Sequence, residues 1–487
     1  MKQATLIIRD EVNVKFEGLD PATRRKISNS LKFMLPYAYH MPAYKLGRWD
    51  GCVRFCDIAG RTYLNLLDKV LPIIQAEGYE INIDDRREHK ENFDFELVDE
   101  NTFANKTWPV GHPVAGQPVV LRDYQIDIVN KFLEHPQCLQ EVATGAGKTL
   151  VTAVLSKKCE PYGRTIVVVP NKSLVKQTEE DYVNLGLDVG VYYGDRKELG
   201  KTHTICTWQS LNILHKKTKK QEAPFPLTDF IEDVICIIID EVHQAKADVL
   251  KTLLTGPFAD IPLRWGLTGT IPKDEADFTS LKASLGQVVN ALSAHELQEQ
   301  GVLSNCNVNV VQLQDTYEFN NYASELKHLV TDPDRIKFMS KMFKGINESG
   351  NTLILVDRIK TGQTLLENIP EAVFISGDTD VDSRKEHYDE VKDAQGKIIV
   401  ATYGVASVGI NIPRIFNLVL VEPGKSFVRV IQSIGRGIRK AEDKDHVEIW
   451  DITSSCKYSK RHLTQRKKFY KEAQYPFAIE KLKWEKQ

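Results

Sequence analysis

One segment of the chain has the residue types and spacing of a phosphate-binding loop. It runs Ala143, Thr144, Gly145, Ala146, Gly147, Lys148, Thr149. It follows a candidate strand and precedes an apolar helix, which is the setting that such a loop requires. Its glycines would let backbone N–H groups approach phosphates, Lys148 would reach the β and γ phosphates, and Thr149 would ligate magnesium. The segment departs from the usual pattern at Val142, where the first glycine is expected.

Two carboxylates follow the most apolar run of the chain. Asp240 and Glu241 come directly after residues 234–239, which read as a buried parallel strand. Carboxyl ends of parallel strands meet at one edge of a sheet, so we expect both carboxylates near Lys148. Asp240 would hold magnesium, and Glu241 would orient and deprotonate an attacking water. Either carboxylate alone could be a solvated loop residue, but together with the loop they indicate ATP hydrolysis.

Two arginines lie three positions apart on one face of a predicted helix in the second half of the chain. Arg436 and Arg439 would act as arginine fingers, stabilising charge on the transferred phosphoryl group. A solvated basic helix face is the alternative interpretation.

Short segments in a fixed order through residues 121–440 resemble the motifs of superfamily 2 helicases. Residues 121–125 resemble the adenine-reading motif, and 401–413 resemble a motif shared by DNA backbone and ribose, although Asn411 stands where many relatives have Asp. The resemblance implies nucleotide contacts by Arg122, Gln125, Gly409 and Asn411, and a catalytic role for Gln432. It implies coupling of hydrolysis to movement by His243, Thr268, Gly269 and Thr270. It also implies strand contacts by Asn171, Lys172, Thr207, Gln209 and Thr402.

Buried strands alternate with helices beyond residue 118, and this pattern predicts the scaffold that positions these residues. Candidate strands lie at 166–169, 204–207, 234–239, 353–356, 398–401 and 418–422. The alternation is typical of parallel sheets covered on both faces by helices. We therefore expect an α/β fold with two tandem RecA-like P-loop lobes, residues 91–303 and 304–453, and ATP between them. A basic helical C-terminal extension, 454–487, would follow.

Residues 1–90 read as a small α/β nucleic-acid-binding domain. Two strands, 4–9 and 12–16, precede a helix with Asp20 as N-cap and Pro21 at its first position. A hairpin over 51–64, a helix over 67–77 and a strand over 79–83 would complete this domain.

Cations alternate with aromatic residues in the same domain. Residues 37–55 interleave Tyr37, Tyr39, Tyr44, Trp49 and Phe55 with Lys45, Arg48 and Arg54. Such a mixture suits phosphates and exposed bases, although rings in a small domain also build its core. A second candidate backbone contact, or a solvated helix face, is the basic run of Lys457, Lys460, Arg461, Arg466, Lys467, Lys468 and Lys471.

The bulk composition is that of a folded globular protein of several units. The chain has 487 residues, 42% hydrophobic and 27% charged, with a net charge of −2. Its apolar runs are too short to cross a bilayer and its first residues do not form a leader, so we expect no membrane contact and a cytoplasmic location. The eight scattered cysteines suggest reduced, buried thiols.

The resemblance extends over the whole chain to a recombination helicase of this superfamily. It implies ATP and magnesium as cofactors, and DNA, especially branched or forked, as partner. It also implies branch migration, fork regression and unwinding of RNA–DNA hybrids by a monomeric or weakly associating protein. Alternatives are a double-strand translocase and an ATP-gated sensor without strand separation. A nuclease built on Glu88, His89 and Lys90 is disfavoured because its second carboxylate is missing and Asp68 falls in a predicted helix.

Overall fold

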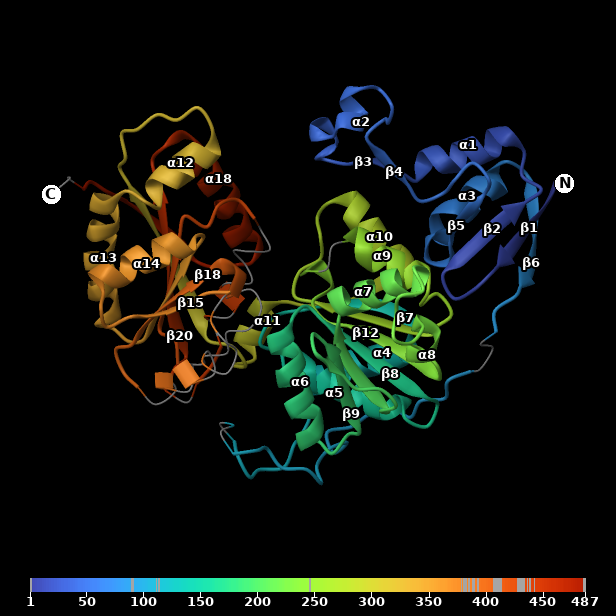
Figure 1. The fold of residues 1–487 in the computed structure, drawn as a ribbon, viewed down its shortest axis with the longest axis horizontal. Helices are drawn as coiled ribbons and strands as arrows, with labels where there is room; N and C mark the ends of the chain where they lie inside the picture. The colour runs from blue at the N-terminus through green and yellow to red at the C-terminus, as the bar shows by residue number, and fades with distance from the viewer. Residues whose placement is uncertain are drawn as a thin grey trace. The chain divides into compact units, whose positions relative to one another are not determined.

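The structure is a computed structural model that falls into two compact units (Figure 1). One comprises the chain up to residue 142 together with 147–291, and the other comprises 143–146 and 292–487. The described residues are 2–88, 92–110, 112, 114–244, 247–377, 379, 383, 386–387, 390–391, 394–405, 414–426, 434–435, 437, 439–441 and 443–484. None of the helices described there is long and apolar enough to cross a membrane.

The N-terminal module, residues 2–88, is built on a sheet of order β5-β2-β1-β6. Its strands are β1 (Lys2–Ile8), β2 (Asn13–Glu17), β5 (Arg61–Tyr63) and β6 (Tyr79–Asp85). The predicted first hairpin is confirmed, because β1 and β2 pair antiparallel. The predicted helix starts are confirmed too: α1 (Pro21–Ser30) begins where the Asp20 side chain accepts a hydrogen bond from Thr23 N, and α3 spans Leu67–Ala76.

The predicted hairpin over residues 51–64 is wrong. Strand β4 (Cys52–Arg54) pairs with β3 (Lys32–Met34), whereas β5 pairs with β2. The turn at Gly60 does form, with Gly60 N donating to Asp57 O over 3.1 Å. Phe55 and Cys56, however, turn into the core of the module, so the chain leaves one small sheet and enters the other. Between β3 and β4 lie the short helices η1 (Ala38–His40) and α2 (Pro42–Lys45).

The first lobe is the remainder of the first unit, and its sheet has the order β10-β9-β11-β8-β12-β13-β7-β14. The six strands from β9 to β7 run parallel, as predicted. Its strands are β7 (Gln137–Val142), β8 (Arg164–Val169), β9 (Val189–Tyr193), β10 (Arg196–Lys197), β11 (His203–Thr207), β12 (Val234–Ile239), β13 (Leu263–Thr268) and β14 (Gln287–Leu292). Its helices are α4 (Asp123–Glu134), α5 (Lys148–Cys159), α6 (Lys172–Asn184), α7 (Trp208–Lys219), α8 (Leu227–Phe230), η3 (Val242–Gln244), α9 (Ala247–Thr255) and α10 (Glu275–Leu285).

The second lobe, in the second unit, is built on a parallel sheet of order β17-β18-β16-β19-β20-β15-β21. Its strands are β15 (Asn305–Leu313), β16 (Thr352–Val356), β17 (Val373–Ile375), β18 (Ile398–Thr402), β19 (Asn417–Val421), β20 (His446–Ser454) and β21 (Phe477–Leu482). Its helices include α11 (Ala294–Glu299), α12 (Tyr322–Leu329), α13 (Pro333–Asn347), α14 (Ile359–Asn368) and α18 (Lys457–Glu472). The C-terminal extension is helical only in α18, because β21 joins the sheet beside β15.

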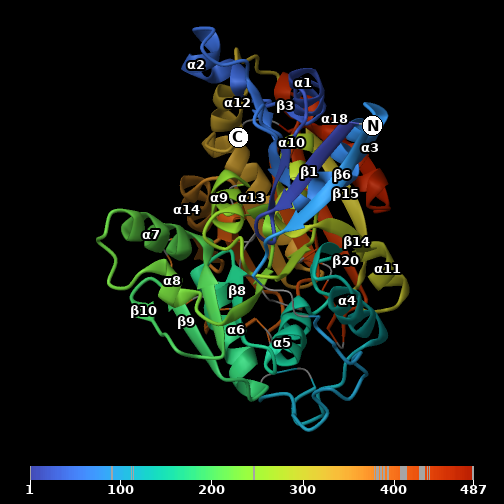
Figure 2. The same ribbon diagram turned by 90° about the vertical axis from the view of Figure 1, so that its right-hand side faces the viewer.

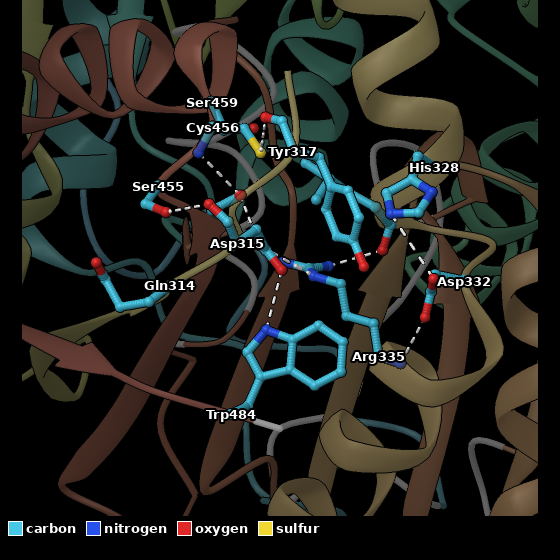
Figure 3. Close-up of polar contacts among 12 residues, drawn as sticks. Gln314, Asp315, Tyr317, His328, Asp332, Arg335, Ser455, Cys456, Ser459 and Trp484 are labelled. Carbon is cyan, nitrogen blue, oxygen red and sulfur yellow. Dashed lines mark hydrogen bonds and ion pairs between the residues drawn. The ribbon is translucent and has the colours of Figure 1, made fainter. Parts of the chain in front are cut away.

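A buried polar cluster ties this C-terminal extension to the second lobe (Figure 3). The Asp315 carboxylate accepts hydrogen bonds from Trp484 Nε1 at 2.9 Å and from Ser454 Oγ at 2.5 Å. Arg335, fully buried, lies with its Nε 3.4 Å from Asp315 Oδ2 and its Nη2 2.9 Å from Glu422 Oε1. Buried charges need such partners, so the extension is part of the lobe rather than a separate tail.

Candidate ATP site and nucleic-acid contacts

The predicted phosphate loop leaves the end of β7 and leads into α5. Gly145 and Gly147 have φ of +93° and +79°, a left-handed conformation that favours glycine. A Cβ added to Gly147 would lie 2.6 Å from Gln125 Nε2, so the predicted adenine contact packs directly against the loop. Gln125 is buried, and its Oε1 accepts a hydrogen bond from Arg122 N at 3.0 Å. The structure thus places Gln125, the predicted adenine contact, beside the predicted phosphate loop.

The lysine of the loop and the second carboxylate of the strand form a buried ion pair. Lys148 Nζ lies 2.7 Å from Glu241 Oε1, and their side chains are 9% and 6% exposed. Parallel pairing of β7, β13, β12 and β8 carries both residues to the carboxyl edge of the sheet. Glu241 has φ of +51°, an uncommon conformation for a residue other than glycine, and its N–H donates to Asp240 Oδ1 at 2.9 Å. A strained backbone at a residue whose carboxylate pairs with a buried lysine is typical of a functional site.

A hydrogen-bonded chain connects this carboxylate to the predicted coupling residues. His243 Nδ1 lies 2.6 Å from Thr268 Oγ1 and 3.6 Å from Glu241 Oε2. Thr268 Oγ1 donates to Thr270 O at 2.8 Å, so His243 Nδ1 is assigned as the donor to Thr268. Gly269 N donates to Glu241 Oε2 at 3.4 Å. The predicted hydrolysis and coupling segments therefore meet within hydrogen-bonding distance.

The predicted strand-contacting residues of the first lobe gather at the same edge of the sheet. Strands β8 and β11 are neighbours, with Thr207 opposite Val169. Asn171 and Thr207 are the N-caps of α6 and α7, and each side chain accepts a backbone N–H of its own helix. Gln209, exposed, donates from Nε2 to Pro170 O at 3.3 Å, and Lys172 is exposed at the first turn of α6. Asn171 and Thr207 thus have a structural role in addition to any contact with a strand.

The aromatic residues of the N-terminal module divide between its core and its surface. Phe55 is 2% exposed and lies in the core, whereas Tyr37 and Tyr39 are 49% and 57% exposed. Lys45 and Arg48 are exposed on or just after α2. Arg54 forms an ion pair with Asp50, which offsets part of its charge. Phe55 is therefore a core residue, whereas a contact of Tyr37 and Tyr39 with bases stays a prediction.

Four predicted site residues, Gly409, Asn411, Gln432 and Arg436, lie outside the described residues. Thr402 ends β18 in the second lobe.

Arg439 forms an isolated antiparallel bridge with Leu303. Its carbonyl accepts a hydrogen bond from Lys444 Nζ at 2.7 Å, and so does the carbonyl of Gly437 at 2.5 Å. Burial beside Arg439 lowers the pKa of Lys444 to about 7. Sequence reasoning missed this lysine, which holds the backbone of the arginine segment.

One residue of the predicted C-terminal basic surface is internal. Arg466 is 1% exposed; its Nε and Nη2 bind Asp451 at 2.8 and 2.9 Å, and its Nη1 donates to Gly424 O at 2.7 Å. Helical periodicity could have predicted the burial of Arg466, because Leu463 and Tyr470 on the same face of α18 are also buried. Arg466 is therefore a structural residue, while Lys457, Lys460, Arg461, Lys468 and Lys471 remain exposed.

Comparison with known proteins identifies two family domains in the chain. Residues 118–273 match the family described as Type III restriction enzyme, res subunit, and residues 334–441 match the helicase conserved C-terminal domain. The chain has a fold like that of a putative HsdR subunit fragment of a type I restriction enzyme from Vibrio vulnificus, with a TM-score of 0.55 and 16% identity. That match covers 96% of this chain and 85% of the other.

Several of the curated relatives are named as helicases. The chain is 23% identical to the ATP-dependent DNA helicase uvsW of Enterobacteria phage T4 over 450 residues, which cover 88% of this chain and 86% of that protein. It is 25% identical over 342 residues to the putative DNA 3'-5' helicase Rad25 of Haloarcula marismortui, covering 66% of this chain and about half, 51%, of that protein. Together with the two parallel sheets, these matches show that the chain is a superfamily 2 helicase, an ATP-dependent hydrolase similar to the uvsW helicase.

Proposed function

We propose that the protein is an ATP-dependent DNA helicase or translocase that acts on branched DNA. It would drive branch migration and fork regression, and it would unwind RNA–DNA hybrids. The observation that carries this proposal is an N-terminal module with exposed cations that is packed directly on the first lobe. Likeness to the uvsW helicase over 88% of the chain supports it, because the match extends well beyond the two family domains.

At the ATP site, we propose that Lys148 binds the phosphates and that Glu241 orients the attacking water and accepts its proton. Thr149 and Asp240 would hold magnesium. They fit this ion because hard oxygen ligands suit it and because few protein ligands are needed when phosphates supply the others. Bound magnesium would neutralise charge on the phosphates. Arg436, Arg439 and Gln432 of the second lobe would stabilise the transition state.

Hydrolysis would be coupled to movement through His243 and Thr268, which join the carboxylate to the loop after β13. Asn171, Lys172, Gln209 and, in the second lobe, Thr402 would contact the tracked strand. The N-terminal module would bind a duplex arm through Lys45, Arg48 and Arg54, with the exposed rings of Tyr37 and Tyr39 available to unpaired bases. Because the module would hold a duplex arm while the two lobes translocate along a strand, the protein would prefer branched substrates.

The test compares binding to a four-way junction and to a single strand of matched length over a salt series. Deleting the module would uncover the Ala283 side chain that packs in its core, so charge reversal is the cleaner change. The variant Lys45→Glu with Arg48→Glu should weaken junction binding more than single-strand binding and reduce the salt dependence. The matched control reverses two exposed lysines of α13, Lys337→Glu with Lys344→Glu. Equal loss for both substrates would show that the module is a general anchor.

Strand displacement and protein displacement assays separate the alternatives. Displacement of a bound protein from duplex without strand separation would identify a double-strand translocase. Nucleic-acid-dependent hydrolysis with neither output would identify an ATP-gated sensor.

A further inference from the structure

The N-terminal module packs against the two helices that follow the hydrolysis and coupling segments. Helix α9 begins at Ala247, shortly after His243, and α10 begins at Glu275, shortly after Thr270. Figures 1 and 2 show both helices on the side of the first-lobe sheet that carries the module. We call the contact between the module and these helices the seam. It consists of Phe55, Tyr63 and Asp68 from the module with Lys251, Lys282 and Ala283 from α9 and α10.

Contacts with α9 combine a cation over aromatic rings with a side-chain hydrogen bond to a backbone carbonyl. Lys251 Nζ lies 4.2 Å from the ring centre of Phe55 and 5.3 Å from that of Tyr63. Asn13 Nδ2 donates to Thr255 O, the last residue of α9, at 2.8 Å. A cation at this distance from a ring centre is attracted to the negative face of the ring, more strongly where the ring is buried. The first turn of the module's sheet is thus fixed to the end of α9.

Contacts with α10 are ionic and apolar. Lys282 Nζ lies 2.6 Å from Asp68 Oδ2, and the lysine side chain is only 9% exposed. Ala283 is fully buried within the hydrophobic core of the module. A mostly buried lysine needs its carboxylate partner more than a surface lysine does. The position of α10 therefore depends on where α3, which carries Asp68, is held.

Hydrogen bonds from β13 connect α9 and α10 to each other, and the same strand ends at the candidate ATP site. Arg264, fully buried in β13, donates from Nη2 to Leu254 O of α9 and from Nε to Ser284 O of α10, over 2.5 and 2.9 Å. Thr268, at the end of the same strand, bonds to His243. An unbroken series of packed and bonded groups thus runs from the module to Glu241.

We propose that the seam couples nucleic-acid binding by the N-terminal module to ATP hydrolysis, with Lys282 and Lys251 as positioning residues. This inference rests on the proposed function, because it assigns the module's nucleic-acid contact an effect on the ATP site. A displacement of the module by bound nucleic acid would shift α9 and α10, and with them the segments of His243 and Thr268. Linkage between two binding sites is reciprocal: if nucleic acid on the module changes the affinity for nucleotide, nucleotide changes the affinity of the module for nucleic acid by the same factor.

The experiment uses full-length Lys282→Met and Lys251→Met variants, which remove each charge but keep the length of the side chain. The readouts are turnover without nucleic acid, turnover at saturating nucleic acid, and junction affinity with and without a non-hydrolysable ATP analogue. We expect basal turnover and nucleotide-free junction affinity within about twofold of wild type, and stimulation by nucleic acid reduced by about fivefold or more. The effect of the ATP analogue on junction affinity should shrink as well.

Two controls separate positioning from loss of structure. Lys282→Arg keeps the ion pair and should restore stimulation, whereas Lys26→Met removes an ion pair with Glu77 that lies entirely inside the module and should change nothing. Stimulation is measured with whichever of single strand, duplex or junction activates wild type most. Absence of any junction preference in wild type would count against the proposed function alone. Full stimulation and an unchanged analogue effect in both methionine variants would overturn the coupling role of the seam.

Discussion

Lys148 and Glu241, from the first turn of α5 and the residue pair after β12, form a buried ion pair with Nζ 2.7 Å from Oε1. The ammonium group of Lys148 and the carboxylate of Glu241 compensate each other's charge. Replacing either residue with a neutral one therefore leaves the other charge buried with less electrostatic compensation. The pair sets the residue that would bind phosphate directly beside the residue that would activate water.

Lys148→Ala should abolish ATP hydrolysis and leave DNA binding largely intact, because the lysine would hold phosphates rather than the strand. It should also lower the free energy of unfolding by about 3–5 kcal/mol, because the buried Glu241 loses the lysine paired with it. Adding Glu241→Gln should recover part of that stability but no activity. Turnover, DNA affinity and urea unfolding of the single and double variants test this, and normal turnover in Lys148→Ala would disprove the assignment.

Glu241→Gln should bind ATP and stall before hydrolysis, because an amide cannot accept the proton of the attacking water. We expect single-turnover rates to fall by about 10²–10⁴-fold with ATP affinity nearly unchanged. Glu198→Gln, a surface change in the same lobe, is the control. Wild-type turnover in Glu241→Gln would move the role of base to another residue.

His243 and Thr268 should behave as one coupled unit in a double-mutant cycle. Their 2.6 Å contact predicts that His243→Ala and Thr268→Val are non-additive by about 0.5–3 kcal/mol in the activation free energy of unwinding. Basal ATP hydrolysis should fall less than unwinding does. The control is the cycle of His243→Ala with Thr207→Val, whose side chains are not hydrogen-bonded to each other in the described structure, and it should be additive. If the two cycles give the same coupling energy, His243 and Thr268 do not act as a coupled unit.

Arg436→Ala should lower the turnover rate far more than the affinity for ATP, as expected of a cation engaged mainly in the transition state. Steady-state turnover and equilibrium ATP binding, measured on the same preparation, give the two quantities. Equal loss in both would indicate a contact already made in the ground state.

Arg264→Met should destabilise the first lobe by about 3–5 kcal/mol, because several buried carbonyl acceptors lose their donor at once. Arg264 is fully buried and bonds to the carbonyls of Leu254, Phe258 and Ser284. Arg164→Met is the control, since that arginine also donates to backbone carbonyls, those of Lys201 and Glu232, but is partly exposed. Urea unfolding that gives the same loss for both variants would contradict this account.

The elements and the candidate ATP site could be predicted from the sequence because their signals are local. Glycines that can adopt left-handed positions, a lysine next to them and carboxylates after an apolar run predict a phosphate site without knowledge of distant contacts. Buried runs such as 234–239 and 418–421 predict parallel strands for the same reason. The N-cap of α1 at Asp20 is likewise contained within a few neighbouring residues.

Only the tertiary structure decided which polar groups turn inward and which segments meet. Arg264, Arg335 and Arg466 look like surface cations in the sequence, yet all three are buried. Backbone carbonyls of other elements accept hydrogen bonds from Arg264, and buried carboxylates pair with Arg335 and Arg466. Strand β5 pairs with β2 rather than with β4, and Phe55, which lies between β4 and β5 in the chain, is buried in the core of the module. Lys282 and Asp68 are 214 residues apart, and no periodicity or spacing connects them. Such pairs arise from packing of whole elements, so a pattern read along the chain contains no record of them.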